Sequence, residues 1–192
     1  MTLKMKFKLL LAIAVTNLVV LNAFPVPAQL GIRTSLAQNS AEVKNWQPYQ
    51  IPNEFSIRYP SNWFLERSPQ PAGATPRELI IITNLKPTLG GGRVSPNLIK
   101  TDIAIEPDNL ETVVNQMLES VEPGTRLTRR GKTKVGGREA LRLWFAGANT
   151  NTIITLIRYN TNETLSMKSY YQKNHSALPI IQTIHGSVRA IE

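Results

Sequence analysis

Residues 126–171 constrain the fold more than any other part of the chain, because their apolar and polar side chains alternate with the two-residue period of β-strands. Two turn sequences interrupt the pattern, Gly136-Gly137 and an Asn-Thr-Asn-Glu sequence at 160–163. Glycine and asparagine adopt the backbone angles that tight hairpins require. Strands joined by such turns pair antiparallel, so this segment predicts two consecutive hairpins.

Earlier segments have strand patterns too. Phe55, Ile57 and Tyr59 alternate with polar residues, and a Tyr-Pro-Ser-Asn turn at 59–62 leads into a short strand at 63–65. Residues 79–82 are Leu-Ile-Ile-Ile, which is typical of a fully buried strand, and residues 100–106 alternate again.

Two segments have the helical period instead. Asp108 is expected to cap the first helix, and Pro123-Gly124 to end it. The second helix is expected over 176–188. Amphipathic helices cover sheet faces, so the predicted fold class is α+β, with one antiparallel sheet sandwiched between helices in an α/β/α arrangement. The apolar stripe of the first helix follows the i, i+3, i+4, i+7 rule at Leu110, Val113, Val114, Met117, Leu118 and Val121.

The first residues have the pattern of a secretory signal peptide. Three lysines precede an apolar run at 9–21, and small residues offer a cleavage site after Ala28 and a second one after Ala37. The run is shorter than the roughly twenty residues that span a bilayer, so cleavage is favoured over an uncleaved anchor. We expect a signal peptide at 1–28, a flexible lead at 29–48 and a single domain at 49–192.

The sequence contains no cysteine, although export normally permits disulfides. The core alone must therefore hold the fold, thiol catalysis is excluded, and no cysteine is present to carry the lipid of a lipoprotein. We expect the mature protein to reach a membrane only through a partner. Residues 1–28 carry three lysines and no acidic residue, so the formal net charge of +9 falls to +6 without them. This moderate excess suits an acidic protein partner or an anionic membrane surface, and export argues against nucleic acid.

The chain offers few residues for catalysis or metal binding. His175 and His185 are further apart than the pairs typical of zinc sites, so we expect them at polar boundary positions of the last helix. The acidic residues between 106 and 122 are explained better by helix capping and a solvated face than by a calcium site. No Gly-x-Ser-x-Gly nucleophile motif occurs.

The longest internal loop is expected at 84–97, where glycine and proline are frequent. Its Gly-Gly-Gly-Arg sequence at 90–93 lacks the Lys-Ser/Thr pair and the following helix of a phosphate-binding P-loop, which argues against nucleotide binding. Long loops nevertheless often carry function, so this one is an alternative site for a small ligand.

Basic residues are concentrated on one predicted strand. Strict alternation places Arg126, Arg130, Lys132 and Lys134 on one face of it, together with Thr128. Such a face does not pack on an apolar core, so it contacts water or a partner. Lysines often protect an edge strand from self-association, which is one explanation. The other is our hypothesis that this face docks on an acidic protein surface.

The predicted domain begins with the order Tyr49-x-x-Pro52-x-x-Phe55-Ser-Ile-Arg-Tyr59-Pro60-x-x-Trp63. This order resembles the opening of the PsbP-like superfamily. The later succession of a helix, a Gly-Gly hairpin, a long hairpin and a final helix is similar to the same fold. The resemblance implies that Trp63 packs under the sheet, in the core.

The resemblance also implies a function. PsbP-related proteins are non-enzymatic lumenal proteins that support photosystem II assembly or its retention of calcium and chloride, while DcrB-like relatives are bacterial envelope proteins. Cyanobacterial PsbP is typically a lipoprotein, so this cysteine-free chain resembles a PsbP-related paralogue more than that subunit.

We therefore expect an exported, non-catalytic accessory protein of photosystem II or the oxygen-evolving complex, in the thylakoid lumen or the periplasm. Calcium is the ion that the resemblance suggests, and the partner is an acidic surface, with photosystem II subunits as candidates. The alternatives are a DcrB-like periplasmic envelope protein, or a small-ligand-binding protein that uses the 84–97 loop.

Overall fold

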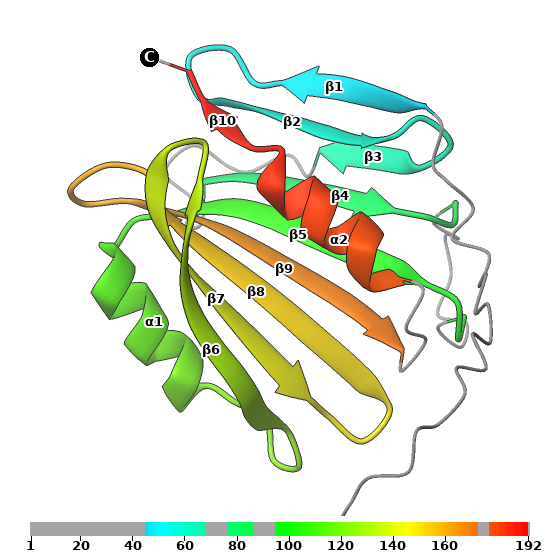
Figure 1. Ribbon diagram of the computed structural model, residues 1–192, viewed down its shortest axis with the longest axis vertical. Coiled ribbons are helices and arrows are strands. Elements are labelled where there is room, and N and C mark those ends of the chain that lie inside the picture. Colours follow the sequence, from blue (N-terminus) through cyan, green and yellow to red (C-terminus); the bar gives the residue numbers. More distant parts are fainter. Residues whose placement is uncertain (1–44, 68–76, 87–94, 173–176, 192) are drawn as a thin grey trace, which may run out of the picture. The chain divides into compact units, whose positions relative to one another are not determined.

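The computed structural model describes residues 45–67, 77–86, 95–172 and 177–191, which belong to the unit Gln38–Glu192. A seven-stranded antiparallel sheet with the order β3-β4-β5-β9-β8-β7-β6 forms its centre. A smaller antiparallel sheet has the order β1-β2-β10 (Figure 1). The strands are β1 (Trp46–Gln50), β2 (Phe55–Pro60), β3 (Phe64–Arg67), β4 (Arg77–Thr83), β5 (Ile99–Glu106), β6 (Arg126–Val135), β7 (Arg138–Ala146), β8 (Thr150–Arg158), β9 (Thr164–Gln172) and β10 (Arg189–Ala190).

Both predicted hairpins are confirmed. β6 and β7 join at Gly136 and Gly137, whose φ angles of 58° and 82° lie in the region that glycine enters without strain. β8 and β9 join through a turn in which the backbone amides of Tyr159 and Asn160 donate to the carbonyl of Glu163 at 3.0 and 3.2 Å.

The first predicted helix is α1 (Leu110–Glu119), and its apolar stripe packs on β7 and β8. The predicted cap is wrong by one residue. Oδ1 of Asn109, not of Asp108, accepts hydrogen bonds from the backbone amides of Glu111 and Thr112 at 3.1 and 3.0 Å. Asparagine and aspartate cap equally well. Asn109 is the cap because its backbone is extended directly before the helix begins.

The large sheet is covered on both faces. Leu141, Leu143 and Phe145 of β7 pack on the face that α1 covers. On the other face lie α2 (Ala177–Gly186) and the small sheet, and Figure 1 shows α2 crossing the large sheet next to β9. The α+β class and the antiparallel pairing are as predicted, but a single sheet between two helices is not, because α2 shares its face with a second sheet.

The second sheet arises from strand pairs that the sequence pattern does not show. β2 is a predicted strand, but it pairs with β1 and with the two-residue strand β10 instead of joining the large sheet. β1 is mostly polar and begins at Trp46, before the predicted domain start at Tyr49. Ser187 links β2 to the chain end, since its Oγ accepts from the amide of Arg58 at 2.9 Å and donates to the carbonyl of the same residue at 3.1 Å.

Three aromatic residues near the start of the domain, Phe55, Tyr59 and Trp63, belong to the core as the sequence predicts, whereas Phe64 of β3 is exposed. Phe55 and Ile57 are fully buried, and Trp63 retains 8% of its exposed area. They pack with apolar side chains of β4, β5 and β9 in one cluster between the two sheets. This cluster is therefore not a binding surface. Within the described segments, neither helix is long and apolar enough to cross a membrane.

Candidate protein-docking site

β6 forms one edge of the large sheet and pairs on one side only, with β7. The four predicted docking residues, Arg126, Arg130, Lys132 and Lys134, are all exposed on it. A fifth basic residue, Arg129, is also exposed on the strand. The edge strand is therefore basic along most of its length.

A β-bulge changes which residues share a face. Leu127 pairs with Phe145, but the next pairing is Arg129 with Trp144, so Thr128 is an extra residue in β6. Beyond the bulge, Arg130, Lys132 and Lys134 lie on the α1 side of the sheet. Arg126 pairs with Ala146 and lies on the α2 side, so its predicted place on the same face is wrong. Alternation holds only in a regular ladder, and the sequence does not show the extra residue.

In the described part of the chain, no ion pair compensates the basic side chains of β6. Within the described residues, none of Arg126, Arg130, Lys132 and Lys134 forms an ion pair. The carboxylate nearest in register, Glu139, pairs instead with Arg158 at 3.0 Å. The strand therefore presents positive charge that the described part of the protein leaves uncompensated.

A groove of about 280 Å³ runs between α1 and this edge of the sheet. Arg130, Lys132 and Arg158 line it, and Glu111 and Glu139 lie on its walls. Apolar side chains of α1 and β7 form its floor. The groove is large enough for one or two side chains of a docking partner, and three cations face two carboxylates in it.

On the α2 side of the same edge, two arginines flank a tryptophan. The guanidinium carbon of Arg129 lies 4.6 Å from the ring centroid of Trp144, and that of Arg142 lies 6.0 Å from it. Sequence reasoning missed Arg129 because the bulge decides its face. It missed Arg142 and Trp144 because both lie in a strand that otherwise alternates like a core strand.

Behind Arg142 lies a buried chain of hydrogen bonds. Nε of Arg142 donates to Thr155 Oγ1 at 3.0 Å, and this oxygen lies 2.8 Å from Nδ1 of His185. Nε2 of His185 lies 2.8 Å from Ser169 Oγ, which is 2.7 Å from Thr101 Oγ1. A neutral imidazole has one donor and one acceptor nitrogen, so either tautomer satisfies both neighbouring hydroxyls.

The expectation that His185 lies at a polar boundary is wrong, because the residue is fully buried. Burial, and then the positive charge of Arg142, lowers the pKa of His185 to about 3. The ring is therefore neutral at physiological pH. The signal in the sequence is its place four residues after Ile181 on the buried stripe of α2, but its polar partners come from other strands.

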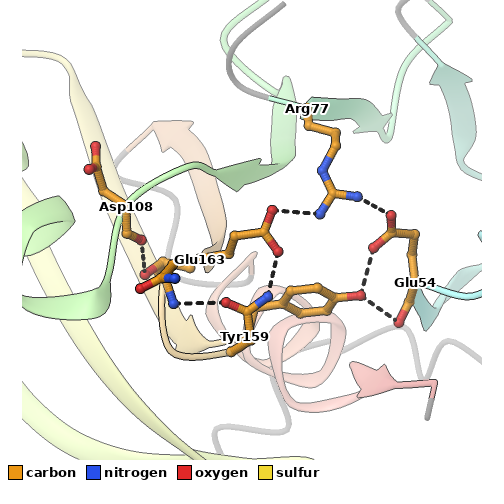
Figure 2. Close-up of polar contacts among 8 residues, drawn as sticks. Glu54, Arg77, Asp108, Tyr159 and Glu163 are labelled. Atoms are coloured by element: carbon orange, nitrogen blue, oxygen red, sulfur yellow. Dashed lines mark hydrogen bonds and ion pairs between the residues drawn. The ribbon is translucent and has the colours of Figure 1, made fainter. Parts of the chain in front are cut away.

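A second polar network joins the β1–β2 connection, the first residue of β4 and the β8–β9 turn (Figure 2). Arg77 lies between two carboxylates: it forms an ion pair with Glu54, and its Nη2 lies 2.8 Å from Oε1 of Glu163. The hydroxyl of Tyr159 donates to Oε2 of Glu54 at 2.6 Å. Burial, followed by this hydrogen bond and the charge of Glu54, raises the pKa of Tyr159 to about 12. The guanidinium group of Arg77 thus balances the charges of the Glu54 and Glu163 carboxylates.

The described residues contain no group of three or more histidine and carboxylate side chains that could hold a metal ion. Of the acidic residues considered for calcium, Glu106 accepts a hydrogen bond from Ser166 at 2.7 Å, and Asp108 accepts one from Gln116 at 3.3 Å. Glu111, Glu119 and Glu122 are exposed. His175 lies outside the described residues.

Two further cavities bear on the small-ligand alternative. Most of the 84–97 loop lies outside the described residues, and its described ends are joined by a hydrogen bond from Asn84 Nδ2 to the carbonyl of Asn97 at 2.8 Å. A pocket of about 160 Å³ lies beside these ends. A groove of about 600 Å³ lies elsewhere, where Met117 and Phe145 provide apolar surface and Lys168 a positive charge.

No protein-family model matches the chain, and no curated protein sequence matches it either. Solved structures do. Cyanobacterial PsbP (CyanoP) of Synechocystis sp. PCC 6803 is 10% identical, with a TM-score of 0.51 over 76% of this chain and 92% of that one. LpqN of Mycobacterium tuberculosis, described as involved in cell envelope biogenesis, is 12% identical, with a TM-score of 0.49 over 77% and 91%.

A protein of unknown function from Pseudomonas aeruginosa is 15% identical, with a TM-score of 0.43 over 74% of this chain and 94% of that one. At such identities the similarity shows the fold alone. The alignment with the cyanobacterial protein covers most of both chains, and it agrees with the resemblance of the Tyr-Pro-x-x-Trp segment. The chain therefore has a PsbP-like fold.

Proposed function

We propose that this chain is an exported, non-catalytic accessory protein of the PsbP-like type, which docks on an acidic protein surface through the edge strand β6. One observation carries the proposal: the exposed basic side chains of this strand have no ion-pair partner among the described residues. A protein edge that keeps such charge exposed attracts a surface of opposite sign and speeds association with it.

Photosystem II or its oxygen-evolving complex is our first choice for the partner, and the thylakoid lumen for the location. The support is the PsbP-like fold and the signal-peptide pattern at 1–28. A DcrB-like role in the periplasm has the same fold and leader in its favour. Calcium enters this proposal as an ion that the partner complex would retain.

The proposal of a non-catalytic role draws on the environment of His185. Both of its ring nitrogens are engaged by hydroxyls and the side chain is fully buried, so it reaches no substrate. General acid-base catalysis requires contact with the group that gains or loses the proton. His185 thus serves the structure instead.

Affinity purification from mildly solubilised native membranes tests the docking. A C-terminally tagged chain should co-purify with an acidic partner at low salt and lose it at high salt, because screening weakens attraction between exposed charges. The double variant Arg130→Glu/Lys132→Glu should recover at least about tenfold less partner.

The matched control is Arg58→Glu/Lys86→Glu, which makes the same change of charge on exposed residues of other elements. It should recover as much partner as the wild type. Recovery of photosystem II subunits supports the first choice, and recovery of envelope proteins alone supports the DcrB-like role. Equal loss in both variants, or no loss in the first, would contradict docking through β6.

A small-ligand role at a place other than the expected 84–97 loop has one observation in its favour, the groove of about 600 Å³, which is the size of many small-molecule sites. A ligand that binds only the folded state raises the melting temperature. A screen of small amphipathic anions by thermal shift, with Lys168→Gln as the variant, distinguishes this role from docking.

A further inference from the structure

The α2 side of the β6–β7 edge carries a second concentration of positive charge, on the sheet face opposite to Arg130, Lys132 and Lys134. The register sets Arg129 opposite Trp144, and Arg142 lies two residues earlier on the same face of β7. The bulge in β6 is what brings Arg129 to this side. Two guanidinium groups thus lie close to one indole ring, at 4.6 and 6.0 Å from its centroid.

The two arginines are held in different ways. Arg129 is exposed and stacks on Trp144, whose position is fixed by packing against the cluster under α2. Arg142 is half-buried, and its Nε is fixed by Thr155, which is in turn fixed by His185. No hydrogen bond or ion pair within the described residues occupies the terminal nitrogens of Arg142, so its outer donors are oriented and free.

No counter-charge for these two cations occurs among the residues that the structure describes. Neither Arg129 nor Arg142 forms an ion pair within the described segments, and the carboxylate of the neighbouring Glu139 belongs to the opposite face of β7. Burial, and then the like charge of Arg129, lowers the pKa of Arg142. A bound anion that contacts both guanidinium groups would offset this unfavourable interaction.

We infer that Arg129, Trp144 and Arg142 form a binding site for a phosphate group, either as the free ion or as a phosphomonoester. Two guanidinium groups match the charge of about −2 that such a group carries near neutral pH. The planar guanidinium donors match its oxygens in bidentate fashion. The chain Thr155–His185–Ser169 acts behind the site by orienting Arg142. The inference does not depend on the docking proposal.

The three tryptophans of the chain provide a direct test. Their indole N–H groups give three separate signals in a nitrogen-correlated NMR spectrum, and the signal absent in Trp144→Phe belongs to Trp144. Titration with sodium phosphate at constant ionic strength should shift this signal along a saturable curve and leave the signals of Trp46 and Trp63 in place.

Arg129→Gln should weaken phosphate binding at least about tenfold, as expected for the loss of a charge-assisted hydrogen bond. Because Arg129 is exposed, this variant should fold normally, whereas Arg142→Gln leaves a buried hydroxyl short of a partner. The matched control Arg130→Gln/Lys132→Gln removes two charges from the opposite face and should bind phosphate as tightly as the wild type.

Two further arms identify the ligand. Glycerol phosphate should bind within a fewfold of inorganic phosphate if an ester is accepted, and weaker binding by more than about tenfold assigns the site to the free ion. Acetate should bind more weakly than either. Tighter binding of acetate, no saturable shift of the Trp144 signal, or undiminished binding by Arg129→Gln would each overturn the inference.

Discussion

The two polar networks of this protein differ in how they meet water. The chain through His185 is buried, and its central ring is neutral and fully enclosed. The network around Arg77 is charged and open, with 43% of the Arg77 side chain exposed. The comparison teaches that a polar side chain can be fully buried when it is neutral and its hydrogen bonds are satisfied, as in His185. Charged side chains such as Arg77 stay near solvent.

The difference predicts which conditions affect each network. A buried neutral network responds to loss of a partner or to forced protonation, and salt does not reach it. A half-exposed ionic network responds to screening and contributes little.

The largest effect should come from His185→Leu. The substitution removes both ring hydrogen bonds and leaves buried hydroxyls of Thr155 and Ser169 with fewer partners, which should lower the free energy of unfolding by about 3 kcal/mol. Urea denaturation measures it. The control Gln182→Leu changes an exposed residue of the same helix and should cost less than about 0.5 kcal/mol. A loss below about 1 kcal/mol for His185→Leu would mean that the hydroxyls find other partners.

Acidification should produce the next effect. The folded pKa of His185 is about 3, below the ordinary value of 6.5, so the unfolded chain binds a proton that the folded chain rejects. Stability from this group is complete above pH 6.5 and falls as the pH drops toward 3, by up to about 1.4 kcal/mol per unit.

Denaturation curves between pH 7 and pH 5 test this, since carboxylates remain largely ionised there. The wild type should lose stability across the interval and His185→Leu should not. His175 is present in both proteins, so its own titration cancels in the difference. Equal slopes would contradict the lowered pKa, because His185 would then take up its proton over the same pH range in the folded and the unfolded chain.

Tyr159→Phe should have a smaller effect, about 1 kcal/mol, because it removes one hydrogen bond to a carboxylate in a half-exposed network. The raised pKa of Tyr159, about 12, makes this contribution complete below pH 10 and lost as the pH rises through 12. Denaturation at pH 8 gives the magnitude. Tyr49→Phe is the control, since Tyr49 is a half-buried tyrosine of β1 outside this network.

Arg77→Gln should have the smallest effect, less than about 1 kcal/mol, and the difference from the wild type should vanish in 1 M salt. Denaturation in low and high salt measures both. If the loss of unfolding free energy persists in high salt, Arg77 acts like His185, as a group shielded from solvent, and the contrast between the two networks is wrong.

The parts predicted from the sequence depend on neighbours along the chain. The stripe of α1 follows from side chains three and four residues apart, and the β6–β7 turn follows from two glycines with positive φ. The helix cap at Asn109 was missed by one residue, because asparagine and aspartate satisfy the same capping rule. The sequence pattern did not indicate strand β1.

The candidate site could be predicted only in part. Arg130, Lys132 and Lys134 share a face as their spacing suggests, but Arg126 does not, because Thr128 adds a residue to the ladder. Whether β6 contains an extra residue at this point depends on how it pairs with β7. Arg129, Trp144 and Arg142 come together only through the register of β6 with β7, so no spacing within the sequence indicates them.

The sequence by itself determined the class of the fold, the hairpins, the two helices and the basic character of β6, because period, turn residues and charge are local properties. Tertiary structure decided the rest: the second sheet, the burial of His185 and the side of the sheet that each arginine faces. These depend on contacts between distant segments, such as Thr155 with His185 and Ser187 with Arg58, which form only when the whole chain folds.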